Sequence, residues 1–202
     1  MKRIAGLSSV LIALVLAVTV AGCGSAEPEA EQRSPSDVAA LYLEAMRGNV
    51  AGLREHNPDT EITEEGVFGS ANSSMLETWG VRPSAEQEAQ ITEAMLAGLS
   101  EVEFTVVDEK VDGESATVTV AIRGIDMSSS LDTQFATIGG QITEDTEDVA
   151  IIAVLDQAWR EAPLMPEPTN VDMPFVAVSD GRWIADPQGG EAAAAAYVKF
   201  AG

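Results

Sequence analysis

The stretch VEFTVVDEKVDGESATVTVAIRGID, residues 102–126, decides the fold. Apolar and polar residues alternate on both sides of Asp112-Gly113. Such alternation is typical of strands that bury one face, and Asp-Gly between two alternating runs is a hairpin turn signal. We therefore predict two antiparallel strands, 102–111 and 115–125, that pack one face against a core.

Segments with helical spacing precede this hairpin. The first begins at Ser34-Pro35-Ser36-Asp37, where either Ser34 or Ser36 can cap the helix. It ends at Gly48, and a short second helix runs from Asn49 to Leu53. A later helix begins with the capping box Ser84-Ala85-Glu86-Gln87. The apolar residues at helical intervals are Val38, Leu41, Tyr42, Ala45, Met46, Ile91, Met95 and Leu99.

Helices and a second hairpin follow the first one. The predicted elements are a helical segment at 127–162 divided by Gly139-Gly140, strands at Val171–Val178 and Arg182–Ala185, and an Ala-rich helix at Glu191–Phe200. This order predicts an α+β fold, in which a curved antiparallel sheet packs against helices. The helical insertion lies between the two hairpins.

The start of the chain has the parts of a secretory signal peptide. A basic beginning precedes an almost wholly apolar run, Ile4–Val20. That run is at the short edge of what spans a bilayer, and no basic cluster follows it, which argues against a transmembrane helix. We predict a signal peptide at 1–22, a disordered tether at 23–35 and a single domain at 36–202.

Val20-Ala21-Gly22-Cys23 resembles the bacterial lipoprotein box. The resemblance implies cleavage before Cys23 and attachment of fatty acyl chains, such as palmitate, at that residue. Two or three chains make a stable anchor to the membrane, with the protein facing outside the cytoplasm. Cys23 is the only cysteine, so we expect the mature chain to contain no disulfide.

The charge of the chain is strongly one-sided. It has 33 acidic residues against 11 Lys and Arg, a formal net charge of −22. Such a field repels nucleic acid, so we expect no DNA or RNA binding. It is compatible either with simple solubility or with attraction to a basic partner in the cell envelope.

Three stretches resemble extracytoplasmic bacterial lipoproteins with the nuclear-transport-factor-two-like (cystatin-like) fold. YLEAMRGNVAGLREH (42–56) is similar to the opening helix pair of that family, VDGESATVTVAIRGID (111–126) to its strand pair, and VDMPFVAVSDGRWIAD (171–186) to its closing hairpin. The resemblance implies a cone-shaped domain that can enclose a cavity. Many such proteins have no assigned activity. We expect the domain to bind a small apolar ligand or an envelope partner, and an isomerase or dehydratase acting in the cone is the alternative.

The candidate pocket residues of such a cone are Tyr42, Trp79, Asp126, Trp159 and Trp183. An acid–base pair of Asp126 and Tyr42 would serve an enzyme, but an aspartate at the end of a strand is more often a turn residue. Tryptophans in a small domain more often belong to the core. We therefore assign no catalytic residue.

Other reactive side chains also have plainer interpretations. The single histidine, His56, is expected to be a surface residue at a helix end, and Ser128-Ser129-Ser130 to cap the next helix. Clusters of Cys and His, which transition metals need, are absent from the sequence. The acidic stretches 57–65 and 144–148 leave calcium open, although the first has Ile62 where a calcium loop needs Gly. We expect no metal and no cofactor.

Overall fold

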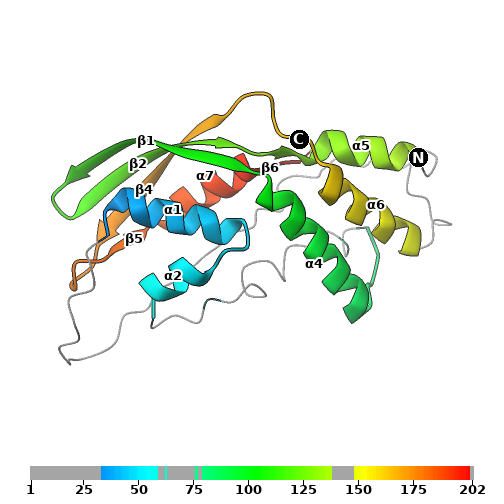
Figure 1. Cartoon of the computed structure of the whole chain (residues 1–202), viewed down its shortest axis with the longest axis horizontal. Coiled ribbons are helices and arrows are strands. Elements are labelled where there is room, and N and C mark those ends of the chain that lie inside the picture. Colours follow the sequence, from blue (N-terminus) through cyan, green and yellow to red (C-terminus); the bar gives the residue numbers. More distant parts are fainter. Residues whose placement is uncertain (1–32, 59–61, 63–75, 77–78, 138–147, 201–202) are drawn as a thin grey trace.

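The computed structural model describes residues 33–58, 62, 76, 79–137 and 148–200 (Figure 1). The predictions for the signal peptide, the lipoprotein box with Cys23 and Gly139-Gly140 lie outside these residues. In the part of the chain that is described, no helix has the length and hydropathy needed to cross a membrane.

Four antiparallel strands form one curved sheet in the order β1-β2-β4-β5. The strands are β1 (Glu103–Asp112), β2 (Ser115–Arg123), β4 (Thr169–Ala177) and β5 (Trp183–Ala185). Both predicted hairpins are therefore confirmed, and the α+β class with them. At the first turn, Gly113 has a φ of 62°, a conformation that glycine adopts without strain.

Among the described residues, the helices α1 (Pro35–Met46), α2 (Ala51–His56) and α4 (Ala85–Ser100) precede the sheet in the chain. Their predicted starts and ends follow from local chemistry. Ser34 accepts a hydrogen bond from the Asp37 N–H at 3.1 Å, and Ser84 closes a second capping box. Gly48, at φ 95°, ends α1 as predicted. The second helix begins two residues later than predicted and runs on to His56.

The predicted helical insertion consists of α5 (Met127–Thr137) and α6 (Asp148–Glu161). Figure 1 places both beyond one end of the long strands. Gly98 of α4 lies directly against the backbone carbonyl of Trp159 in α6, with no room for a side chain between them. This close approach holds the insertion against the rest of the domain.

The end of the chain differs from the prediction. Helix α7 spans Pro187–Tyr197 and begins earlier than Glu191, because Asp186 caps it and Pro187 suits a first turn. It does not continue to Phe200. Instead, the chain extends into β6 (Val198–Lys199), which pairs in parallel with β3 (Ile125–Asp126).

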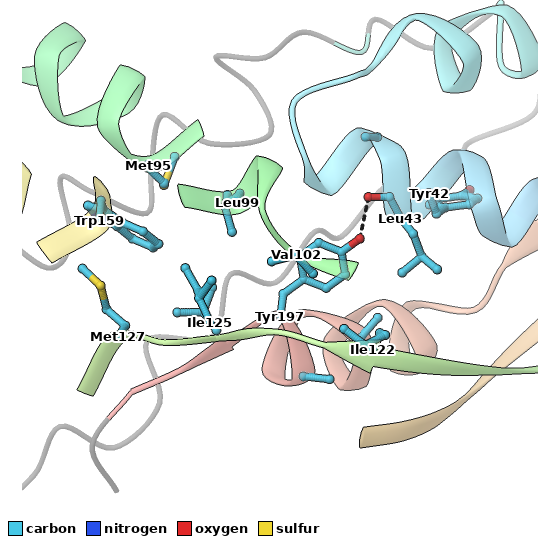
Figure 2. Packing of buried hydrophobic residues seen from close by; sticks show 14 of the residues in the cluster. Tyr42, Leu43, Met95, Leu99, Val102, Ile122, Ile125, Met127, Trp159 and Tyr197 are labelled. Atoms are coloured by element: carbon cyan, nitrogen blue, oxygen red, sulfur yellow. Dashed lines mark hydrogen bonds between the residues drawn. The ribbon is translucent and has the colours of Figure 1, made fainter. Parts of the chain in front are cut away.

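The core lies between one face of the sheet and the helices. Side chains on one face of β2 and of the middle of β4 are buried: Ala116, Val118, Val120, Ile122, Val171, Met173 and Phe175. Figure 1 shows α1 and α7 along the same side of the sheet. The Tyr197 hydroxyl of α7 donates a hydrogen bond to the Leu43 carbonyl of α1 at 2.7 Å, which joins the two helices inside the core (Figure 2).

Candidate functional site

Tyr42 and Trp183 lie at the β5 end of the sheet. The Tyr42 ring packs edge-on against Phe175, with ring centroids 6.3 Å apart. Burial raises the pKa of Tyr42, and a hydrogen bond with the Ala185 backbone partly opposes this. Trp183 is half-buried, and its carbonyl oxygen is 2.9 Å from Nε2 of His56. These two aromatic residues therefore have neighbours on α1, α2, β4 and β5.

Trp79 and Trp159 are placed against the helical insertion and the end of the chain. The Trp79 ring is edge-on to Phe135 of α5, with centroids 5.8 Å apart. The Trp159 ring is edge-on to Phe200, at 6.2 Å. Trp159 is only 2% exposed, and Figure 2 shows it in the apolar cluster that contains Met95.

Asp126 joins three elements at this same end. One carboxylate oxygen, Oδ1, accepts a hydrogen bond from the Ser129 N–H at the start of α5, at 3.1 Å. The other, Oδ2, accepts from Nζ of Lys199 in β6, at 2.8 Å. The bond from Lys199 is the largest cause that lowers the pKa of Asp126. Asp126 is therefore held as a carboxylate that caps α5 and fixes β6.

The candidate residues thus form two groups rather than one. Tyr42 packs on Phe175, which pairs with Ala116 in β2. Asp126 is ten residues further along the chain from Ala116, beyond the far end of β2, so it lies toward the opposite end of that strand from Tyr42. An acid–base pair of Asp126 and Tyr42 would have to bridge this separation. The other three have neighbours in the insertion and around β6: Trp79 contacts Phe135 of α5, Asp126 caps the start of α5, and Trp159 of α6 contacts Phe200.

His56 is not the surface residue that the sequence suggested. It is the last residue of α2, 9% exposed, and its ring bonds the Trp183 carbonyl. Its own carbonyl accepts a hydrogen bond from Nη1 of Arg182 at 3.1 Å. His56 follows buried Leu53 by three residues, so both lie on one helix face. That spacing could have indicated a buried position that ties α2 to β5.

The serine prediction is also wrong. Asp126, not a serine, caps α5, because its side chain receives the Ser129 N–H. Ser130 lies inside the helix, where its buried hydroxyl donates to the Ala158 carbonyl of α6 at 2.8 Å. It therefore fastens the two helices of the insertion together. A lone hydroxyl bonded in this way has no histidine to activate it.

The acidic stretches are described only in part. Asn57 is 3% exposed, and its side-chain amide donates to the Leu53 carbonyl. Ile62 is buried, and the other residues of 59–65, together with 144–147, lie outside the described part. Among the residues that are described, no group of three His, Cys, Asp or Glu could hold a metal ion.

One polar atom in the core was not anticipated. The indole Nε1 of Trp159 is buried, and among the residues that the structure describes it has no hydrogen-bond acceptor. Buried tryptophan N–H groups usually find an acceptor, because leaving a donor unpaired inside a protein costs free energy. The sequence gives no signal for this, since it depends on how three helices and the chain end meet around one ring.

No protein-family model and no curated protein matches the chain. Its structure is similar to a crystal structure of a candidate lipoprotein, ycdA, from Bacillus subtilis, with a TM-score of 0.57 and 14% identity. The match covers 81% of this chain and 56% of that one, so the chain spans a little over half the length of that protein. At this identity the likeness is one of fold alone. The chain therefore has an α+β fold that also occurs in a candidate lipoprotein.

Proposed function

We propose that this protein is a lipid-anchored domain outside the cytoplasm that binds a small apolar ligand and has no catalytic activity. The proposed site of lipid attachment is Cys23, which directly follows Val20-Ala21-Gly22 of the lipoprotein box. The fold shared with a candidate lipoprotein supports this location. We further propose that the fold is of the nuclear-transport-factor-two-like type, which the curved sheet with helices along one side supports.

The anchor is tested with the full-length chain expressed in a bacterial host. We expect the wild-type protein in the membrane fraction, with an intact mass that fits cleavage before Cys23 plus acyl chains. Cys23→Ala should leave the precursor uncut or release the protein from the membrane. Ser25→Ala, two residues beyond, is the matched control and should behave as wild type. Equal fractionation and unacylated mass for wild type and Cys23→Ala would contradict the proposed anchor.

The buried, unpaired Nε1 of Trp159 is the observation that carries the ligand proposal. A ligand with an apolar body and one acceptor oxygen would match the apolar residues around the ring and supply the missing acceptor. The same contact would recover part of the free energy that an unpaired buried donor costs, about 1–3 kcal/mol. Trp79 and Asp126 belong to the same end of the domain and are the further residues that we propose near the ligand.

The ligand is tested by purifying the mature protein from host membranes and measuring its mass under native conditions. We expect an additional mass that organic solvent removes. Trp159→Phe keeps a ring in the core but lacks the N–H, so it should lose that mass while remaining folded. Trp183→Phe, at the β5 end of the sheet and away from Trp159, is the matched control and should retain it. If the wild-type protein carries no such mass, or if Trp159→Phe retains it fully, the ligand proposal is wrong.

A further inference from the structure

Strand β1 is the open edge of the sheet. It is ten residues long, and among the residues that the structure describes β2 is the one strand paired with it. Its second half is exposed throughout, from Val107 to Asp112. Val107 and Val111 are 57% and 52% exposed, and they are two of the four large apolar side chains that are exposed in the described part of the chain. Such an edge presents backbone groups that another strand can pair with.

The hairpin turn shows which backbone groups face outward. Asp112 pairs with Ser115 across a two-residue loop, so this is the hydrogen-bonded pair that closes the hairpin. Hydrogen-bonded and non-bonded pairs alternate along antiparallel strands. Val111, opposite Ala116, and Glu109, opposite Val118, are therefore non-bonded pairs, and their N–H and C=O groups point away from β2.

A hydrogen bond also connects this edge strand to the start of α1. The carboxylate of Glu109 accepts a hydrogen bond from the Ser36 N–H in the first turn of α1, at 2.8 Å. A β-bulge between Val106 and Asp108 separates the exposed half of β1 from the half that covers the core. The open segment is thus residues 108–112, fixed over the start of α1.

The charges of this segment select what can pair with it. Asp108, Glu109 and Asp112 are acidic, and the single cation, Lys110, forms an ion pair with Asp108 at 3.3 Å. A second copy of the chain would bring carboxylates opposite carboxylates, which is unfavourable across strands. A strand that alternates basic and apolar side chains would instead place its cations near Asp108 and Asp112 and its apolar residues near Val111.

We propose that residues 108–112 of β1 accept a basic, extended segment of an envelope protein as an added strand. This inference rests on the extracytoplasmic location in the proposed function, and it adds the chemistry of a protein partner to it. The backbone groups of Glu109 and Val111 supply the hydrogen bonds, and the acidic side chains supply the preference for a basic strand.

The first test uses two synthetic peptides, one alternating lysine with valine and one alternating glutamate with valine. The mature protein should bind the basic peptide and not the acidic one in fluorescence anisotropy at low salt. Raising the salt from about 0.02 M to about 0.5 M should weaken binding at least tenfold, because exposed charges are screened. Bound peptide should slow amide hydrogen exchange at Glu109 and Val111. Failure to bind the basic peptide at low salt would overturn the proposal.

Two variants separate strand addition from general attraction to an acidic protein. Val111→Pro removes an outward N–H at an edge position that tolerates proline, and it should weaken binding at least tenfold. Val149→Ser, at an exposed valine on α6, should bind as tightly as the wild type. If circular dichroism shows that Val111→Pro is unfolded, Asp112→Lys is used instead. This variant should weaken binding of the basic peptide and leave the fold intact. Equal binding by Asp112→Lys and wild type would overturn the proposal, while membrane attachment through Cys23 would stand unaffected.

Discussion

Replacing Tyr197 with phenylalanine should remove a hydrogen bond on which the end of α1 depends. The carbonyl of Leu43 is among the last four of that helix, which lack ordinary partners. The Arg47 N–H, four residues on, donates to Glu44 at 3.0 Å instead. The Tyr197 hydroxyl therefore supplies the hydrogen bond to Leu43, at 2.7 Å inside the core. Tyr197→Phe keeps the ring but leaves this carbonyl buried without a donor.

The expected loss is about 1–3 kcal/mol in the free energy of unfolding, the cost of one buried polar group without its partner. For a domain of this size, a loss of about 2 kcal/mol lowers the Tm by roughly 4–8 °C. Thermal and urea unfolding, followed by circular dichroism, measure both quantities. The m-value should stay unchanged, because the same surface is exposed on unfolding.

Thr119→Val is the matched control for this variant. The Thr119 hydroxyl donates to Asp172 over the same 2.7 Å, but on the exposed face of the sheet. Water can replace that bond, so the loss should stay below about 0.5 kcal/mol. If Tyr197→Phe costs no more than Thr119→Val, the buried hydrogen bond does not stabilise the domain as argued.

Three other predictions concern stability. Burial raises the pKa of Tyr42 and Tyr197, so the folded state keeps protons that the unfolded state loses near pH 10. Urea unfolding should show stability that is full below about pH 10 and falls above it, and Tyr42→Phe should reduce that fall; a constant midpoint up to pH 11 would contradict it. The pKa of Asp126 is lowered, chiefly by Lys199, so its contribution holds above its ordinary value of 3.8 and is lost as the pH drops through the folded pKa. Asp126→Asn should therefore show a smaller loss of stability between pH 5 and pH 3 than wild type, and equal losses would refute the role of this pair. Gly98→Ala should force α4 away from α6 and lower the free energy of unfolding by about 1–3 kcal/mol, despite a gain of about 1 kcal/mol in helix propensity. A Tm at or above that of wild type would show that the helices can separate without cost.

Local chemistry explains what could be predicted from the sequence. The turn at Asp112-Gly113 and the caps at Ser34 and Ser84 depend on a few neighbouring residues, and all three are found where they were expected. The alternation in β2 appears directly as alternating burial. The order of the strands does not follow from neighbouring residues in the same way. However, two hairpins can combine into an antiparallel sheet in only a few strand orders.

The misplaced features depend on contacts between distant parts of the chain. The parallel pair of β3 and β6 has only two residues on each side, too few to show a period. Helix α7 contains Gly189, which disfavours a helix in isolation. A glycine is needed there, because a Cβ at this position would lie only 2.7 Å from Cδ of Pro174. His56 was judged by its neighbours in sequence, whereas its burial comes from β5. The candidate pocket residues were chosen by residue type and by the element on which each was expected, so their division into two groups had no local signal.

The hydrogen bond between Tyr197 and Leu43 joins residues 154 positions apart. It cannot form during synthesis until the chain has been made as far as the end of α7. Closing so long a loop is entropically costly and slow compared with forming a helix. Until α7 has been synthesised, the C-terminal end of α1 therefore lacks the hydrogen bond from Tyr197 to the Leu43 carbonyl. A chain whose first helix is completed this late stays partly unfolded for longer, which would suit passage through a membrane channel if the protein is exported as we propose.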